Sequence, residues 1–203
     1  MEFFKLNIML EKLIDLDKEF FIYLNNKESV TDGFWLFITD EKVMFIMFSF
    51  IISFLLIKYD RNNFKITLFF ILITFIATDL IHNHCFKDIF QRLRPCWDID
   101  IPCRVLVEKG GKYGFVSGHA ANFFGIIGII FLRIPNLKLW IKDVLIIWGL
   151  LICYSRIHVG KHYPLDVFFG AILGVIIAYF LYRISKYLMG LNFFSQKVYK
   201  KRN

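Results

Sequence analysis

The sequence predicts an all-α integral membrane protein, a bundle of about five transmembrane helices with an amphipathic interfacial helix at its N-terminus. Of the 203 residues 57% are hydrophobic and the mean hydropathy is +0.55, which is too apolar for an ordinary soluble domain. The apolar residues gather in five runs, at 43–57, 66–81, 120–132, 144–154 and 167–182. Each run approaches the ~20 residues that cross a bilayer core, and neutral, aromatic or snorkelling flanks extend it. A soluble helical bundle is the alternative, but it leaves too little polar surface to cover its outside.

Charge alternates along the chain from one apolar run to the next. Residues 1–42 carry 5 basic and 9 acidic side chains, whereas the segments 58–65, 133–143 and 183–203 together carry 12 basic and 2 acidic ones. Because basic loops stay on the cytoplasmic side, this pattern predicts a multi-pass protein of the cytoplasmic (inner) membrane with its N-terminus outside. The net charge of +8 then reflects topology, and we expect no nucleic-acid partner.

Three parts follow from this pattern: residues 1–42 as an interfacial amphipathic helix and connector, 43–190 as the transmembrane domain, and 191–203 as a basic cytoplasmic tail beside anionic lipid. Apolar residues recur at helical spacing in the first part, at Leu6, Met9, Leu10, Leu13, Ile14 and Leu16. A helix packed on the bundle fits that spacing equally well. Its mixed charges do not resemble a secretory signal.

Two details inside this framework stay open. Cys96 and Cys103 lie in a polar segment on the predicted outer side, where a disulfide forms if the compartment is oxidising. Asp79 lies near the end of the second run, and such a residue is either functional or paired with His82 or Asn83 one turn on. The cysteine spacing gives no zinc motif, so we expect no metal site.

The first polar fragment follows the second apolar run. We expect the helix to continue past Lys87 until Pro95 stops it, which stacks Lys87 and Arg94 on one face two turns apart. Two cations in register can hold one phosphate, although lipid headgroups fit them equally well.

The second fragment, Ser117-Gly118-His119, directly precedes the third run. The Ser117 hydroxyl can donate to a ligand or merely cap the helix. Gly118 allows close approach of a ligand to the backbone, and His119 can give a proton to a leaving oxygen.

The third fragment lies between the fourth and fifth runs, at residues 155–166, and holds Arg156, His162 and Asp166. Pro164 predicts a helix start, which places His162 just before the helix and Asp166 in its first turn, within reach of a ring nitrogen. A histidine oriented by a carboxylate beside an arginine suits nucleophilic attack on phosphorus. A loop whose charges merely face water is the alternative.

The predicted topology brings all three fragments to the outer side, and there they resemble the signature of a known family. The type 2 phosphatidic acid phosphatases (PAP2) belong to the lipid phosphate phosphatase and haloperoxidase-like superfamily. Their signature combines a lysine, six residues and Arg-Pro, then Pro-Ser-Gly-His, then Ser-Arg, five residues, His, three residues and Asp. This chain has Lys87 with Arg94-Pro95, Ser117 to His119, and Ser155-Arg156 with His162 and Asp166. Val116 in place of proline is the departure.

The resemblance implies a PAP2-like helical core and an assignment of roles. The implied phosphate-binding residues are Lys87, Arg94, Ser117, Gly118 and Arg156, and the implied catalytic residues are His162 as nucleophile, His119 as general acid and base, and Asp166 as the partner of His162. Three cations then stand in place of a metal, so no cofactor is expected.

The function implied is a metal-independent hydrolase of the cell envelope that acts through a phosphohistidine on a lipid phosphate or diphosphate. Undecaprenyl diphosphate, phosphatidic acid, phosphatidylglycerophosphate and the phosphates of lipid A all fit. The expected partners are this substrate and membrane lipids, while the oligomeric state stays open. A vanadate-dependent haloperoxidase or a non-catalytic lipid-phosphate binding or transport protein with the same pocket are the alternatives.

Overall fold

The computed structural model describes residues 2–25 and 30–202, and for residues 2, 3, 189 and 191–202 it describes the backbone alone. The helices are α1 (Glu2–Asn25), α2 (Asp32–Thr39), α3 (Glu41–Tyr59), α4 (Phe64–Leu80), α5 (Asp88–Phe90), α6 (Gly118–Arg133), α7 (Leu139–His158) and α8 (Pro164–Arg202). Short 3-10 helices at Arg61–Asn63 (η1) and Pro95–Trp97 (η3) and a π-helix at Ile81–Lys87 (η2) connect them. The described part contains no strand beyond one isolated bridge.

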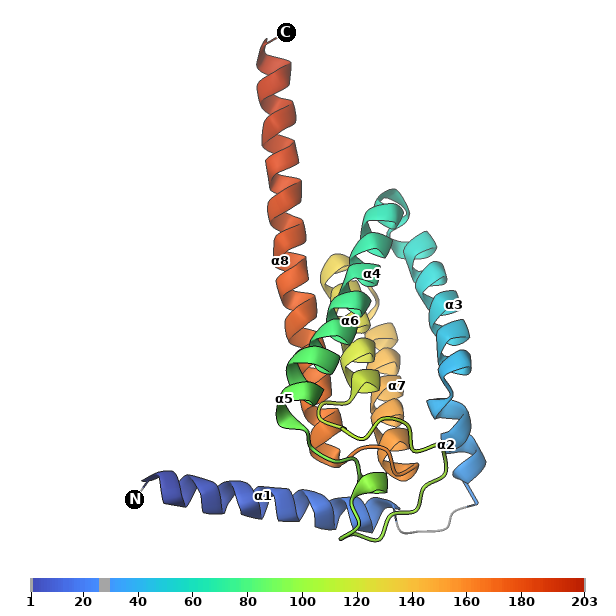
Figure 1. Ribbon diagram of the computed structural model, residues 1–203. Helices are drawn as coiled ribbons and strands as arrows, with labels where there is room; N and C mark the ends of the chain where they lie inside the picture. Colours follow the sequence, from blue (N-terminus) through green and yellow to red (C-terminus); the bar gives the residue numbers. More distant parts are fainter. Residues whose placement is uncertain (1, 26–29, 203) are drawn as a thin grey trace.

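Helices α3, α4, α6, α7 and α8 form the bundle, and α1 lies across one of its ends (Figure 1). Each of the five predicted apolar runs lies inside a helix, which confirms the predicted all-α membrane bundle. Three stretches of the described chain are long and apolar enough to cross a membrane, namely Glu41–Tyr59, Arg61–Phe90 and Pro164–Leu188. Helix α6 is apolar but shorter, and its neighbours bury most of it.

Small residues allow α6 and α8 to pack closely. A Cβ atom on Gly174 would overlap the carbonyl oxygen of Ala121, and one on Gly170 would lie 2.6 Å from the carbonyl oxygen of Ser117. The stripe Gly170, Gly174 and Ala178 that the sequence suggests for helix packing is therefore used in that way. This packing fixes the N-terminal turns of α6 and α8 against each other.

Helix α1 combines both predicted alternatives. Its apolar side chains Leu6, Met9 and Leu10 are exposed, as expected for a helix at a lipid surface. Its last turns pack on the bundle, where Phe21 and Asn25 are buried. The division of the chain into three parts stays a prediction.

The predicted helix through Arg94 is wrong in its last turn. The π-helix η2 and α5 continue α4 only to Phe90, because Gln91 adopts a left-handed conformation with φ 46°. The chain then turns back and pairs with residues 112–114: the Arg94 N–H donates to the Lys112 carbonyl at 3.0 Å and the Gly114 N–H donates to the Arg92 carbonyl at 2.9 Å. Lys87 and Arg94 therefore meet across a turn and not along one helix face.

The two open details are resolved in the described residues. All four cysteines are free thiols, and Cys96 and Cys103 contact the backbone carbonyls of Lys109 and Gly160 instead of each other. The Asp79 carboxylate accepts a hydrogen bond from Asn83 at 3.4 Å, so the paired alternative holds for Asp79.

Candidate active site

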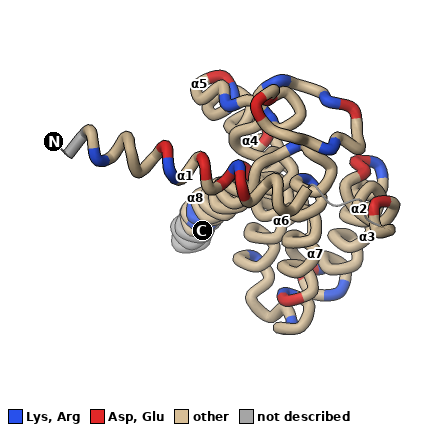
Figure 2. Tube along the Cα trace, turned by 90° about the horizontal axis from the view of Figure 1, so that it is seen from below, with Lys and Arg blue, Asp and Glu red and all other residues tan. Residues whose placement is uncertain are grey.

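The three polar fragments meet at the end of the bundle where α1 lies. The N-terminal ends of α6 and α8 and the C-terminal end of α7 point to this end (Figure 1). Figure 2 looks onto it and shows charged residues around α5 and the connection that follows. The Ser117 N–H donates to the Asp166 carbonyl oxygen at 2.9 Å, which joins the second fragment directly to the third.

His162 and Asp166 form a buried pair. Helix α8 begins at Pro164 as predicted, so Asp166 lies in its first turn, and the two side chains are only 2% and 0% exposed. His162 Nδ1 lies 3.5 Å from Asp166 Oδ2, a charge contact longer than an ordinary hydrogen bond. Asp166 Oδ2 instead accepts the Tyr163 N–H at 3.0 Å. The predicted pair is present as a close contact, without a hydrogen bond between the two side chains.

Burial, together with the charges of Arg94, Arg156, Lys87 and Lys161, holds the pKa of His162 well below its usual value. The imidazole is consequently neutral at neutral pH and keeps a lone pair for attack. These charges belong to the three predicted cations and to Lys161.

Each predicted cation is held by one anchoring contact. Arg156 is 6% exposed and donates from Nη1 to Thr39 Oγ1 at 2.6 Å. Arg94 donates from Nε to the Tyr113 carbonyl at 3.1 Å, and Lys87 donates to Asn83 Oδ1 at 2.8 Å. A cavity of about 260 Å³ is lined by Asn83, His84, Lys87, Asp88, Arg94, Gly111, Lys112 and Tyr113. Lys87 and Arg94 thus share one polar opening.

The Ser117–His119 fragment lies at the start of α6. Ser117 occupies the N-cap position but its side chain makes no capping hydrogen bond, so the simple capping alternative does not describe it. A Cβ atom on Gly118 would overlap the His82 ring, which explains why glycine stands there. His119 follows, with its side chain 17% exposed and its Nε2 atom 4.0 Å from Glu41 Oε1.

Unpaired polar atoms concentrate at this site. Within the described part of the chain, the buried side-chain atoms without a hydrogen-bond partner are Ser117 Oγ, His119 Nε2, Arg156 Nε, His158 Nδ1 and His162 Nδ1. Four of these five belong to predicted site residues. Each such atom costs about 1–3 kcal/mol of folding stability. Their grouping is typical of a site arranged for a ligand and not for stability.

Sequence reasoning missed several residues that contact the site. Lys161 is 6% exposed, and its ammonium donates to the carbonyls of Glu108 and Lys109. Burial, then the nearby charges of Arg94 and Arg156, lower the pKa of Lys161 to about 8. Its position directly before His162 was a signal that could have found it. Thr39 had no comparable signal, because only the fold brings α2 to Arg156.

A helical membrane bundle whose one end buries a His–Asp pair among three cations defines the class of membrane phosphatases that act on lipid phosphates. Residues 66–189 match the PAP2 superfamily, and the chain belongs to this family. The predicted family and enzyme class are thereby confirmed.

Related proteins agree with this class. The chain is 29% identical to a lipid A 4'-phosphatase of Porphyromonas gingivalis over 187 residues, which covers 88% of this chain and 76% of the relative. It is 28% identical to an undecaprenyl-diphosphatase of Sulfolobus acidocaldarius, covering 86% and 81% of the two chains. The crystal structure of a PAP2-type phosphatidylglycerolphosphate phosphatase from Bacillus subtilis superposes with a TM-score of 0.67 at 18% identity, covering 86% and 87%, and shares the fold.

Proposed function

We propose that the protein hydrolyses a lipid phosphate at the outer face of the cytoplasmic membrane through a phosphohistidine at His162. The observation that carries the proposal is the cluster of buried, unpaired polar atoms on Ser117, His119, Arg156 and His162. A phosphoryl group offers oxygens to the first three. The unpaired Nδ1 of His162 faces Asp166 Oδ2 at 3.5 Å, which leaves the other ring nitrogen, Nε2, to attack phosphorus. Family membership by itself does not assign these roles.

In the first step the neutral imidazole of His162 forms a bond to phosphorus while the bond from phosphorus to the leaving oxygen breaks. His119 donates the proton that the leaving oxygen takes up. In the second step His119 removes a proton from water as that water attacks the phosphohistidine, and inorganic phosphate leaves. Asp166 stabilises the positive charge that the His162 ring acquires between the two steps.

Lys87, Arg94 and Arg156 hold the equatorial oxygens of the phosphoryl group, assisted by the Ser117 hydroxyl and the Gly118 N–H. Their charges oppose the negative charge of the transition state, and such preorganised charge supplies most of the catalysis in phosphoryl transfer. The described residues contain no group of three or more His, Cys, Asp or Glu side chains placed to bind a metal ion. We expect the three cations to do the work that a metal does elsewhere.

For the substrate we propose a lipid A phosphate first, because the lipid A 4'-phosphatase relative matches over 88% of this chain. Undecaprenyl diphosphate is the second candidate, supported by the undecaprenyl-diphosphatase relative, which matches over 86%. The two differ at the scissile bond, which is an ester to a sugar in the first and an anhydride in the second.

Phosphate release by the purified protein tests the proposal directly. The panel comprises lipid A, undecaprenyl diphosphate, phosphatidic acid and phosphatidylglycerophosphate, each with and without EDTA. We expect the highest kcat/KM on lipid A, no loss with EDTA, and no release by His162→Ala on any lipid. Release from none of the four by folded wild-type protein, or equal release by His162→Ala, would overturn the proposal.

The proposed orientation places the N-terminus and the site outside and the C-terminus in the cytoplasm, in accord with the basic segments. A tag fused after Asn203 should resist protease added to intact cells and be cut after the membrane is opened. Cleavage in intact cells would refute the orientation while leaving the chemistry untouched.

A further inference from the structure

A chain of buried ionic contacts joins α1 to Asp166. Arg92 Nη1 donates to Asp166 Oδ1 at 2.9 Å, and Arg92 Nη2 donates to Asp17 Oδ2 at 2.6 Å. The other oxygen of Asp17 accepts the Leu165 N–H at 2.9 Å, one residue before Asp166. The side chains of Asp17, Arg92 and Asp166 are 2%, 20% and 0% exposed, so water barely reaches these bonds.

Aromatic packing fixes Arg92 in its place. Its guanidinium carbon lies 4.3 Å from the centre of the Tyr163 ring, and the Tyr163 hydroxyl donates to Asp98 at 2.9 Å. Lys18, the neighbour of Asp17 on α1, pairs with the same Asp98 oxygen at 2.9 Å. Helix α1 therefore reaches the surroundings of His162 at two adjacent positions.

The two oxygens of Asp166 have separate tasks in this arrangement. Oδ1 is held by Arg92, whereas Oδ2 faces the Tyr163 N–H and His162 Nδ1. A planar guanidinium bonded to a carboxylate on each side restricts rotation of both, which a lysine, as a single point charge, does less well. Holding Oδ1 consequently sets the direction in which Oδ2 meets the imidazole.

We infer that Asp17 and Arg92 are positioning residues for the reaction, which orient Asp166 toward His162 and make α1 part of the catalytic unit. The inference rests on the proposed roles of His162 and Asp166. Arg92 lies between Lys87 and Arg94 in the first fragment, but neither Asp17 nor Arg92 is a fixed position of the family signature. Asp17 also accepts the Leu165 N–H and Arg92 stacks on the Tyr163 ring, but the contacts of Lys87, Arg94 and Arg156 described above involve neither residue.

The test compares Arg92→Gln and Asp17→Asn with wild type on the panel lipid that has the highest kcat/KM. We expect kcat to fall roughly 10- to 100-fold in Arg92→Gln and roughly 10-fold in Asp17→Asn, as for loss of one hydrogen bond to a charged group. KM and the inhibition constant of inorganic phosphate should stay within about twofold, because the cations are intact. Asp15→Asn, an exposed carboxylate on the same helix, is the matched control and should match wild type.

A series experiment separates positioning from general support of the fold. In an Asp166→Asn background, Arg92→Gln should lower kcat no further, because Arg92 acts through Asp166. The inference is overturned if Arg92→Gln lowers kcat further in the Asp166→Asn background, or if Arg92→Gln alone has the kcat of wild type. It is also overturned if the loss of kcat in Arg92→Gln accompanies a lowered Tm and weaker inhibition by inorganic phosphate. If His162→Ala retains turnover, the proposed function fails instead, and the two failures are thereby distinguished.

Discussion

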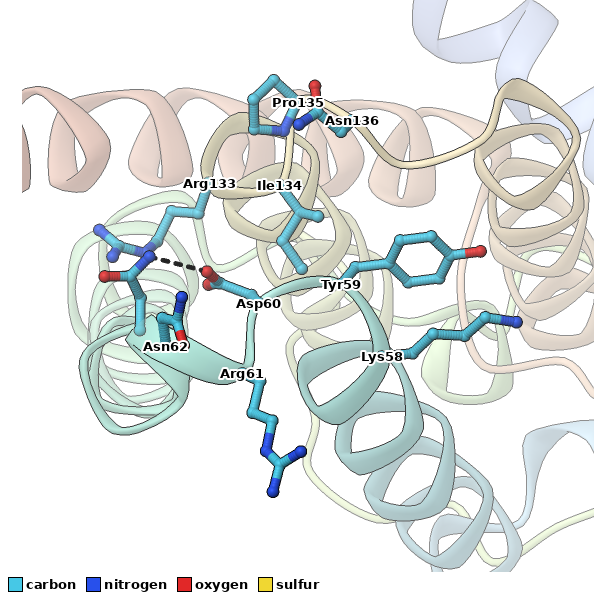
Figure 3. Close-up of a pocket in the computed structure, with 10 residues that line it drawn as sticks. Lys58, Tyr59, Asp60, Arg61, Asn62, Arg133, Ile134, Pro135 and Asn136 are labelled. Carbon is cyan, nitrogen blue, oxygen red and sulfur yellow. Dashed lines mark hydrogen bonds between the residues drawn. The ribbon is translucent and has the colours of Figure 1, made fainter.

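Charged side chains gather at both ends of the helix bundle, but the two ends differ in whether the buried polar atoms have hydrogen-bond partners. At the end opposite α1, a cavity of about 470 Å³ lies between the turn after α3 and the turn after α6 (Figure 3). There Arg133 donates to Thr67 Oγ1 at 2.8 Å and to Ser185 Oγ at 3.2 Å. Asp60 accepts from Asn63 at 3.0 Å and from Thr67 at 2.5 Å.

At the end where α1 lies, the residues of the candidate site leave Ser117 Oγ, His119 Nε2, Arg156 Nε and His162 Nδ1 without hydrogen-bond partners within the described chain. The end opposite α1, by contrast, contributes none of the buried unpaired atoms found among the described residues. Paired polar atoms stabilise a fold, whereas unpaired ones cost stability and are retained where a substrate needs them. The difference teaches that unpaired buried polar atoms, and not cavity size, distinguish the end that holds the proposed active site.

The largest expected effect comes from removal of His162, the proposed nucleophile. His162→Ala should lower phosphate release at least about 10³-fold, because it removes the imidazole proposed to attack phosphorus. The protein should still insert in the membrane and be purified in wild-type yield, since the His162 ring contributes an unpaired atom to the core. Phosphate release in detergent measures the first expectation and membrane fractionation the second. Near-normal turnover would contradict the assignment of the reactive end.

Removal of Arg156, a buried cation of the proposed site, has the next largest expected effect. Arg156→Gln should lower kcat/KM roughly 100-fold, as one charge opposing the transition state is lost. Thr39→Val is the matched comparison, because it keeps Arg156 but removes the 2.6 Å bond that holds it. We expect a loss below about tenfold in that variant. Equal losses in both variants would mean that the contact with Thr39, and not the charge, is what matters.

Local sequence rules predicted the elements that carry the site. Pro164 predicted the start of α8, and the spacing from it placed Asp166 beside His162. The five apolar runs predicted the bundle, and the alternation of charge predicted that the three fragments meet. These features depend on neighbours within about two helical turns or on connectivity, which a sequence states directly.

The contacts that hold the site could not be predicted in the same way. Arg156 bonds Thr39 across 117 positions of the chain and Arg92 bonds Asp17 across 75. Such partners depend on how α1 and α2 pack on the bundle, for which one sequence gives no pattern. The helix end at Phe90 was missed because Gln91, a residue without special turn chemistry, adopts the left-handed conformation.

Lys161 provides a pH-dependent test with a modest effect. Its pKa of about 8 means that the ammonium is charged below pH 8 and loses its charge above it, which weakens the field around the phosphate. We expect kcat/KM to fall roughly fivefold between pH 7 and pH 9, an effect of about 1 kcal/mol. Lys161→Arg, which stays charged throughout, should reduce this alkaline fall. The same fall in Lys161→Arg would assign it to another group.

The smallest effect on turnover is expected at the paired end, where a substitution should change stability and leave catalysis alone. Arg133→Gln removes two hydrogen bonds, to Thr67 and Ser185, and so should lower the free energy of unfolding by about 1–3 kcal/mol. The value of kcat/KM should stay within about twofold of wild type, because Arg133 closes the opposite end of α6 from His119. Thermal unfolding in detergent and phosphate release on the same preparation measure the two quantities together. A selective loss of turnover with unchanged Tm would show that the paired end also takes part in catalysis, and pairing would then no longer separate structural from reactive polar groups.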